Sequence, residues 1–513
     1  MSLSPLTQLG PERPTYHSLK TFLLLALLTL AAILVHGYHL GIEDQAIYLP
    51  GVEKNLNSSL FPYDSELFLP QTRPTLFDEM VAASVHASHM TLDTAVFVWQ
   101  ILSIFLFLLA CWRLVCRCFS AADARWASLA LVAALLTLPV AGTALYLVDQ
   151  YLHPRTLATA GVLFAIVEVM DRRFSLAVLW IALASLLHIQ MAFYGALFCI
   201  FLGWNSAELL DPKGNARQHE SKSLGRPVGT SLLFPLSSLL EPGSESWKEA
   251  ARTRTQHYLL QWRWYEWIGA IAPLALMYWF AAIAQKSREQ RAAFLSRRAA
   301  AFGAFGVVSG LALTVPPQLE RLTPYQPMRI MHLVTLLFVL LAGGFIGQYV
   351  LRNSAVRWLL LFVPLCSGMF YAQRQLFPGS EHLEFPGLQP RNQWVKAFDW
   401  VRANTPEDAY FALDPVHMNR PGEDEHGFRA FSQRSMMADM DKDPGVVTLF
   451  PAVASRWQRE TKARERWNTF TLADFVKLKK EFGVNWVILE KPLRVPLTCP
   501  YENDVVAVCR ISD

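Results

Sequence analysis

Long apolar blocks alternate with polar connections through the first three quarters of the chain. They include "TFLLLALLTLAAILV" (21–35), "AVFVWQILSIFLFLLACW" (95–112) and "IMHLVTLLFVLLAGGFIGQYV" (330–350). Helical runs of this length suit a hydrocarbon core about 30 Å thick. With further blocks near 156–170, 268–284, 299–315 and 356–372, the pattern predicts a polytopic α-helical membrane protein with about nine transmembrane crossings.

One segment, 174–204, is too long for an ordinary crossing. Its 31 residues would span roughly 46 Å as a single helix. Two short crossings would turn every later loop to the other side and place the basic loop at 286–298 outside. We therefore expect one long, broken or partly re-entrant crossing, which makes the polar stretch 205–267 external. Within that stretch, 211–231 has the composition of a disordered loop.

Basic residues collect at alternate connections and predict the orientation, because cytoplasmic loops are enriched in lysine and arginine. They follow the blocks that we expect to end inside: Arg113, Arg117, Arg125, Arg172, Arg173, Lys286, Arg288, Arg291, Arg297, Arg298, Arg352 and Arg357. The segment 37–93 has the opposite character, with eight acids against Lys54 and Arg73. We expect the N-terminus inside, and 37–93, 149–155, 316–328 and everything after about 373 outside, in a cytoplasmic membrane.

Composition supports this class and excludes others. Hydrophobic residues make up 53% of the 513 residues and charged residues 17%, against roughly 25% charged in ordinary soluble proteins. The net charge of +4 is small for this length and argues against a nucleic-acid partner. The seven cysteines show no metal-ligand spacing. Cys499 and Cys509 are candidates for a local disulfide if the C-terminus faces an oxidising compartment.

The pattern changes at about residue 386, where the long apolar blocks stop. "NQWVKAFDWVRANTP" predicts an amphipathic helix that ends before Pro406, and "LADFVKLKKEFGV" predicts a second helix. The strand-like stretches "AYFALDP", "NWVILE" and "VVAVCRI" alternate with them. We therefore divide the chain into a transmembrane domain, 1–385, and an extracytoplasmic α/β domain, 386–513, with a parallel or mixed sheet and helices near 392–404 and 471–482.

Candidate chemistry begins at "GIEDQAIYLP" (41–50), directly after the first apolar block. Glu43 and Asp44 stand there at the expected membrane boundary, on the side opposite the basic loops. A helix start or a solvated edge would also explain two adjacent acids. The stretch "LFPYDSELFLP" that follows has the apolar and aromatic character of a segment lying along the membrane interface.

Other polar side chains recur at the same expected height, in "DQYLHPRT", "LLHIQMAFYG" and "LTPYQPMRIMH". The stretch "HYLLQWRWYEWIGA" adds three tryptophans and a tyrosine at 262–267, on which sugar rings could stack. Polar groups at or inside membrane spans are costly and commonly functional. Each also has an ordinary explanation: arginines that snorkel to headgroups, histidines bonded to buried carbonyls, or an interfacial aromatic belt. If these groups converge, they form one polar cavity at the outer face.

Several short motifs, taken in order, resemble an uncharacterised bacterial branch of the GT-C superfamily of integral-membrane glycosyltransferases. They are "EDQ..YLP" (43–50), "LFPYD" (60–64), "HP" (153–154), "HIQM" (188–191), "WVRANTPEDA" (400–409) and the set Arg429, Arg434, Ser435, Asp439 and Trp457. The second external loop carries a single acid, Asp149, so the resemblance leaves metal dependence open.

The resemblance implies an enzyme that moves a sugar from a polyprenyl-phosphate or polyprenyl-pyrophosphate donor to an unknown glycan, lipid or protein acceptor, in contact with membrane lipids. The resemblance also implies a location in a bacterial inner (cytoplasmic) membrane. Asp44 would be the base, because a partly desolvated acid beside a second acid is a stronger base, and Glu43 would be an orienter or an acceptor-binding group. The implied donor-phosphate ligands are Arg329 first, then Arg155, His153 and His332. The implied cavity-lining residues are His188, Gln190, Tyr325, Trp264 and Tyr265. The cofactor is unknown, and a divalent metal would fit the superfamily.

Other function classes stay open. A non-catalytic lipid-binding membrane scaffold or a transporter would also be polytopic, although a transporter commonly shows internal repeats, and no repeat is visible in the sequence. Among enzymes, a transferase that moves another group from a lipid carrier is the rival interpretation.

Overall fold

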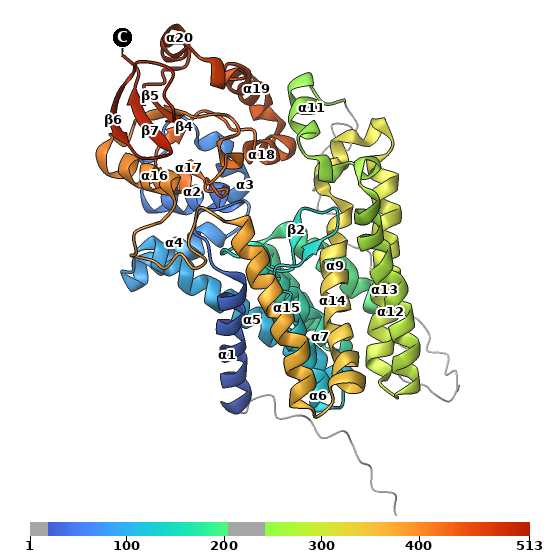
Figure 1. Cartoon of the computed structure of the whole chain (residues 1–513). Helices are drawn as coiled ribbons and strands as arrows, with labels where there is room; N and C mark the ends of the chain where they lie inside the picture. The colour runs from blue at the N-terminus through green and yellow to red at the C-terminus, as the bar shows by residue number, and fades with distance from the viewer. Residues whose placement is uncertain (1–18, 204–241, 513) are drawn as a thin grey trace, which may run out of the picture.

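Apolar helices build one body of the protein, below the C-terminal domain in Figure 1. The computed structural model describes residues 19–203 and 242–512, so the stretch 211–231 lies outside the described residues. The helices of this body are α1 (Leu19–His36), α5 (Leu92–Cys118), α6 (Ala122–Ala134), α7 (Pro154–Met170), α8 (Phe174–Leu187), α9 (Ile189–Gly203), α12 (Trp264–Lys286), α13 (Gln290–Thr314), α14 (Ile330–Phe345), which continues as a π-helical turn (Ile346–Leu351), and α15 (Ala355–Leu376).

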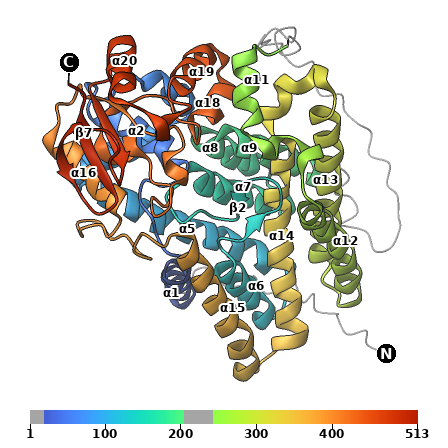
Figure 2. The same ribbon diagram turned by 45° about the horizontal axis from the view of Figure 1, so that its top comes forward.

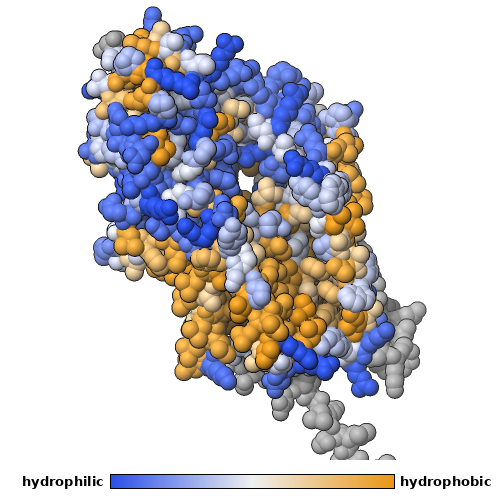
Figure 3. Space-filling view, viewed as in Figure 1, coloured by the Kyte–Doolittle hydropathy of each residue, from blue (hydrophilic) through white to orange (hydrophobic). Residues whose placement is uncertain are grey.

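Length and composition make this a membrane protein. Five helical stretches among the described residues are long and apolar enough to cross a bilayer: Leu19–His36, Leu92–Cys118, Trp264–Lys286, Pro317–Leu351 and Ala355–Leu376. Their outward faces remain apolar, as at Leu360 of α15, which is 71% exposed. Figure 3 shows the hydrophobic residues gathered over the helical body on the face in view. The predicted count of about nine crossings is not confirmed by these helices.

The segment 174–204 is broken, as predicted, but it doubles back. His188 separates α8 from α9 in an extended backbone conformation (φ −154°, ψ 98°). A Cβ on Gly203, the last residue of α9, would lie 3.8 Å from the Phe174 ring at the start of α8. The prediction of a single crossing was wrong, because the two ends of the segment lie together and only its turn points toward the C-terminal domain.

The basic connections meet at the opposite end of the helical body. Asp171 accepts hydrogen bonds from Arg117 at 2.8 Å and from Arg291 at 3.2 Å. Glu289 in turn accepts from the Ser120 hydroxyl at 2.5 Å. Connections that follow α5, α7 and α12 are therefore on one side, as the charge pattern required. Which side faces the cytoplasm stays a prediction.

The C-terminal part is an α/β layer with a mixed sheet, as predicted. Its five strands are β3 (Tyr410–Ala412), β4 (Ser435–Met436), β5 (Trp486–Glu490), β6 (Thr498–Glu502) and β7 (Val506–Arg510), in the order β4-β3-β5-β7-β6. β3 pairs in parallel with β4 and β5, whereas β7 pairs antiparallel with β5 and β6. The predicted helices are α16 (Gln393–Asn404) and α20 (Leu472–Phe482). A Cys499–Cys509 disulfide links β6 to β7.

The first connection after α1 belongs to the C-terminal layer rather than to the membrane interface. Its helices α2 (Gln45–Leu56), α3 (Leu69–Thr72) and α4 (Phe77–Ser88) lie under that layer in Figures 1 and 2. Val52 of α2 shares a buried core with Phe398 and Phe428. In the "LFPYD" stretch, Leu60 and Phe61 pack in a second buried core with Val446 of the C-terminal part, and Asp64 is also buried. The expectation that this stretch lies along the membrane interface was therefore wrong. Asp64 accepts a 2.6 Å hydrogen bond from Arg429 Nε.

Two more groups of elements lie between the helical body and the sheet. The C-terminal part adds α17 (Phe428–Ser432), α18 (Asp443–Leu449) and α19 (Ala454–Lys462), and α11 (Glu245–Arg252) lies beside α18 and α19. The Trp247 indole of α11 donates a 3.0 Å hydrogen bond to the Thr448 carbonyl. The short β1–β2 hairpin (Pro139–Val140, Leu145–Tyr146) faces them across the hollow described next.

Candidate functional site

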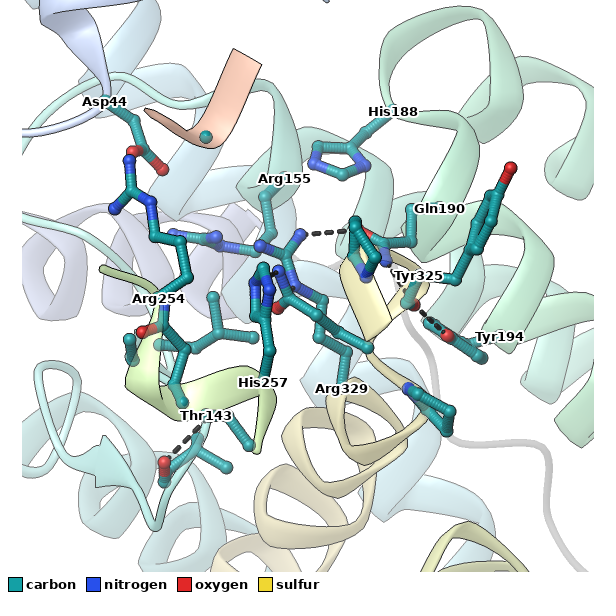
Figure 4. Close-up of a pocket in the computed structure, with 18 of the residues that line it drawn as sticks. Asp44, Thr143, Arg155, His188, Gln190, Tyr194, Arg254, His257, Tyr325 and Arg329 are labelled. Carbon is teal, nitrogen blue, oxygen red and sulfur yellow. Dashed lines mark hydrogen bonds between the residues drawn. The ribbon is translucent and has the colours of Figure 1, made fainter. Parts of the chain in front are cut away.

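A cavity of about 1470 Å³ lies where the helical body meets the C-terminal domain. Residues from eight separate stretches of the chain line it, and the predicted residues among them are Glu43, Asp44, His153, Arg155, His188, Gln190, Tyr265, Tyr325 and Arg329. Figure 4 shows several of these side chains directed into the same space. The structure therefore brings together groups that are far apart in the sequence.

The acidic motif is held in place by the C-terminal domain. The Gly427 amide donates to the Gly41 carbonyl at 2.8 Å, the Glu43 amide donates to the Glu425 carbonyl at 3.0 Å, and Ile42 forms an antiparallel bridge with His426. Gly41 has φ +71°, and a Cβ there would come within 2.4 Å of the Phe431 ring. Glycine is required at this turn because both the backbone conformation and the close approach exclude a side chain.

The two adjacent acids point apart and take different partners. Glu43 forms an ion pair with Lys442, which precedes α18. Asp44 Oδ2 lies 3.1 Å from His153 Nε2. The Asp44 side chain is 39% exposed, and because Asp44 lines the cavity, that exposed carboxylate edge faces the cavity interior.

The pKa of Asp44 shifts in the direction opposite to our expectation. Burial alone would raise the pKa of this carboxyl, but the hydrogen bond from His153 and the charges of Lys442 and Arg155 hold it well below its ordinary value. Burial likewise opposes ionisation of Glu43, and Lys442 overcomes it, so the pKa of Glu43 is also lowered. Both acids are ionised at neutral pH. The lowered pKa of Asp44 therefore gives it no raised basicity, contrary to the expectation from the sequence.

His153 has both ring nitrogens engaged. The Arg155 amide donates to Nδ1 at 2.9 Å, which makes His153 the N-cap of α7. A backbone N–H only donates, so Nδ1 is unprotonated and the ring proton is on Nε2, where it is donated to Asp44. Burial and the neighbouring Arg155 lower the pKa of His153, consistent with a neutral ring. This histidine positions Asp44 and has no free nitrogen for the donor phosphate assigned to it from the sequence.

Arg155 is largely neutralised by a neighbour in the cavity wall. Its Nη2 lies 2.8 Å from both carboxylate oxygens of Asp149, and both side chains are buried. Its charge is therefore compensated before any ligand binds, although it still contributes to the field at Asp44.

Arg329 differs, because its partners are neutral. Its Nε donates to Gln326 Oε1 and its Nη1 to Gln190 Oε1, both at 2.6 Å. Gln326 has a left-handed backbone conformation (φ 49°). Its side-chain Nε2 lies 2.6 Å from His257 Nε2. No carboxylate within 4.0 Å pairs with Arg329 in residues 19–203 or 242–512. This guanidinium is thus oriented by two amides and keeps an uncompensated charge.

A second arginine with the same property was not predicted. Arg254 donates from Nη2 to the Lys442 carbonyl at 2.9 Å, and its Nε is buried with no hydrogen-bond partner in the described part of the chain. Figure 4 shows Arg254 to the left of Arg329, with both side chains extending into the cavity. Arg254 and Arg329 together give the cavity two guanidinium groups that an anion can neutralise.

Two predicted residues do not line the cavity. His332 is 1% exposed and its Nε2 lies 3.0 Å from the Leu147 carbonyl, so it is a buried structural histidine. Trp264 is 74% exposed and lies on the outer face of α12, whereas Tyr265 lines the cavity. One position along a helix turns a side chain by about 100°, which explains the different outcome for these two neighbours.

The later motif residues support the cavity from the side of the C-terminal domain. Arg429 is buried and donates to both oxygens of Asp443, at 2.9 and 3.0 Å. Asp439 Oδ1 accepts from the amides of Asp441, Lys442 and Asp443 at 2.7–3.0 Å. These contacts fix the turn that carries Lys442 to Glu43. They act on the site through Lys442.

Sequence reasoning missed Lys442, Arg254 and His257, all of which line the cavity. A signal for Lys442 existed: it stands alone among acids in "DMDKDPG", where one lysine is needed to offset the local charge. For Arg254 and His257 no local pattern distinguishes them from other polar residues of the connection before α12.

Among the described residues, no group of three or more histidine, cysteine or acidic side chains is arranged to hold a metal ion. No protein-family model matches this chain. No curated protein sequence matches it either. The geometry of the cavity is therefore the basis for a functional proposal.

Proposed function

We propose that this chain is a membrane glycosyltransferase of the GT-C type, which transfers a sugar from a polyprenyl-phosphate or polyprenyl-pyrophosphate donor at the extracytoplasmic face. One observation carries the proposal: an ionised carboxylate edge on Asp44 shares a cavity with Arg329 and Arg254, which have no carboxylate partner among the described residues. Such a site can hold a phosphate and an acceptor hydroxyl together.

The chemistry assigned to each group follows from its partners. The acceptor hydroxyl attacks the anomeric carbon while the bond to the lipid phosphate breaks, and the hydroxyl proton passes to Asp44. Negative charge grows on the departing phosphate, where Arg329 and Arg254 stabilise it. Glu43 is held by Lys442 and orients the loop. The cavity borders apolar helices, so a lipid tail stays in the hydrocarbon region while the headgroup reaches Asp44.

The extracytoplasmic location rests on two independent features. The basic connections gather at the end of the helical body away from the cavity, which is typical of a cytoplasmic face. The Cys499–Cys509 disulfide suits a domain exposed to an oxidising compartment. Under this orientation the sugar is transferred at the extracytoplasmic face, so a lipid must carry it to that side of the membrane.

Asp44→Asn tests the proposal most directly. Asparagine keeps the hydrogen bond from His153 but cannot accept a proton, so we expect transfer to fall about 100-fold or more with donor binding retained. The full-length protein in nanodiscs is given a panel of polyprenyl-phosphate and polyprenyl-pyrophosphate sugars with envelope extract as acceptor, and released lipid phosphate is measured by mass spectrometry.

Asp408→Asn is the matched control, because Asp408 is an exposed acid of the C-terminal domain and should leave the rate unchanged. Full activity of the Asp44→Asn protein would exclude Asp44 as the base. Absence of turnover of every lipid-linked sugar by the wild-type protein would count against the glycosyltransferase proposal itself.

A further inference from the structure

The turn between α8 and α9 repeats the histidine cap seen at α7. The Met191 amide donates to His188 Nδ1 at 3.3 Å, just as the Arg155 amide donates to His153 Nδ1. Histidine is not among the usual N-cap residues, and here it caps two helices that end at the same cavity. The two imidazole rings lie 5.9 Å apart with planes inclined by 31°.

The cap fixes the tautomer of His188. Because a backbone N–H donates to Nδ1, that nitrogen is unprotonated and the ring proton is on Nε2. In His153 the equivalent proton is used by Asp44. In His188 no hydrogen bond engages Nε2 within the described ranges 19–203 and 242–512, and the residue lines the cavity. His188 therefore presents a neutral N–H donor to whatever fills this space.

The surroundings of His188 identify the chemistry of its ligand. Gln190, two positions later, orients Arg329. Arg155 and Arg329 both approach the same region, as Figure 4 shows. A donor beside the uncompensated guanidinium of Arg329 matches an acceptor-rich anion rather than a cation or an apolar group.

We propose that His188 donates its Nε2–H to a non-bridging phosphate oxygen of the lipid donor. The two histidines then have different partners: His153 orients the base, Asp44, and His188 binds the leaving phosphate. This inference rests on the proposed function. His188 forms no covalent bond and transfers no proton; its hydrogen bond strengthens as negative charge grows on the phosphate.

His188→Asn separates the cap from the donor. Asparagine is a favoured N-cap residue and can still accept from the Met191 amide, but its shorter side chain removes the N–H at the Nε2 position. The probe is farnesyl phosphate, and farnesol is the matched ligand without a phosphate.

The affinity of each ligand for the full-length protein in nanodiscs is measured by titration. A thermal melt checks that the variant is folded. His188→Ser introduces another residue that can cap the helix but lacks the N–H, so it tests the same loss independently.

We expect His188→Asn to weaken farnesyl phosphate binding about tenfold, in line with loss of a hydrogen bond to a charged group, with farnesol binding and the melting temperature unchanged. Arg329→Lys should also weaken farnesyl phosphate binding, because the ammonium loses the two-pronged contact. His153→Asn should leave farnesyl phosphate affinity unchanged and slow transfer.

Two results overturn the inference in distinguishable ways. If the His188→Asn and His188→Ser proteins bind farnesyl phosphate as tightly as the wild type while Arg329→Lys binds it weakly, His188 is not a phosphate ligand and the proposed function is unaffected. If the wild-type protein binds farnesyl phosphate no better than farnesol, both the inference and the lipid-phosphate function fail.

Discussion

At the scale of single residues, the site is a balance of charges supplied by distant parts of the chain. Lys442 pairs with Glu43, and its Nζ also lies 3.9 Å from Glu425 Oε2. Burial and the neighbouring Glu43 raise the pKa of Glu425 to about 9. Glu425 therefore holds a proton at neutral pH, and the cluster carries two charged groups rather than three.

Glu425→Gln is expected to change how stability depends on pH. The folded-state pKa of Glu425 is raised, so its contribution is full below its ordinary pKa of about 4.5 and is lost as pH rises toward about 9. Glutamine cannot lose a proton, so the variant should match the wild-type melting temperature at pH 5 and exceed it at pH 8. The Glu425 side chain is 42% exposed, and screening by water makes the difference modest.

Melting curves of the full-length protein in nanodiscs at several pH values measure this effect. Glu481→Gln is the control, because Glu481 is on the exposed face of α20 and should follow the wild type throughout. If the Glu425→Gln and wild-type melting temperatures differ by the same amount at every pH, Glu425 has no raised pKa.

At the scale of elements, the "NTP" motif (404–406) ends α16, and an arginine from another segment binds the backbone at this end. Arg434 is 5% exposed and donates to the carbonyls of Thr405 at 2.6 Å and Arg402 at 2.8 Å. Its Nε also donates to Thr405 Oγ1 at 3.2 Å. The last carbonyls of α16 lack intrahelical partners, so Arg434 caps this helix. This motif stabilises the domain, and Arg402, Thr405 and Arg434 are not among the residues that line the cavity.

Arg434→Met should destabilise the protein by about 1–3 kcal/mol, because buried carbonyls lose their donors. Arg402→Met is a matched control: Arg402 forms an exposed pair with Asp399, and such pairs contribute at most about 1 kcal/mol. The readout is the denaturation midpoint of the full-length protein. A midpoint for Arg434→Met as high as that for Arg402→Met would show that the cap is not needed.

Elements with a regular pattern could be predicted from the sequence. α16 and α20 are amphipathic, and β5 is a short apolar run bounded by turn residues, so each carried its own signal. The doubling back at His188 could not be predicted, because both helices flanking it are apolar on all sides and hydropathy does not distinguish a hairpin from a crossing. Asp44 and Arg329 were found by their position beside apolar blocks.

Other site residues depended on contacts between distant segments. Arg254 is directed into the cavity because its segment packs against the turn before α18, and its Nη2 bonds to the Lys442 carbonyl. That contact is tertiary, and no periodicity in the sequence reports it. The lowered pKa of Asp44 also depends on tertiary contacts, because His153 and Lys442 come from two other parts of the fold.

At the scale of the whole molecule, the cavity and the basic connections are at opposite ends. If the cavity is extracytoplasmic, a cysteine replacing Glu481 should react with a membrane-impermeant maleimide in intact spheroplasts, and a cysteine replacing Arg288 should react only after lysis. Both positions are exposed. The wild-type protein is the control for its five free cysteines, which are buried or partly buried. The reverse labelling pattern would place the cavity in the cytoplasm.

The pairing of the acidic loop with residues 425–427 also sets an order of assembly during synthesis. Glu43 emerges from the ribosome early, but its partner Lys442 is 399 positions later in the chain. The helices can insert into the bilayer before either residue meets the other. We therefore expect a nascent or prematurely terminated chain to reach the membrane without a finished cavity, so that only a fully translated chain can bind the ligand of this cavity.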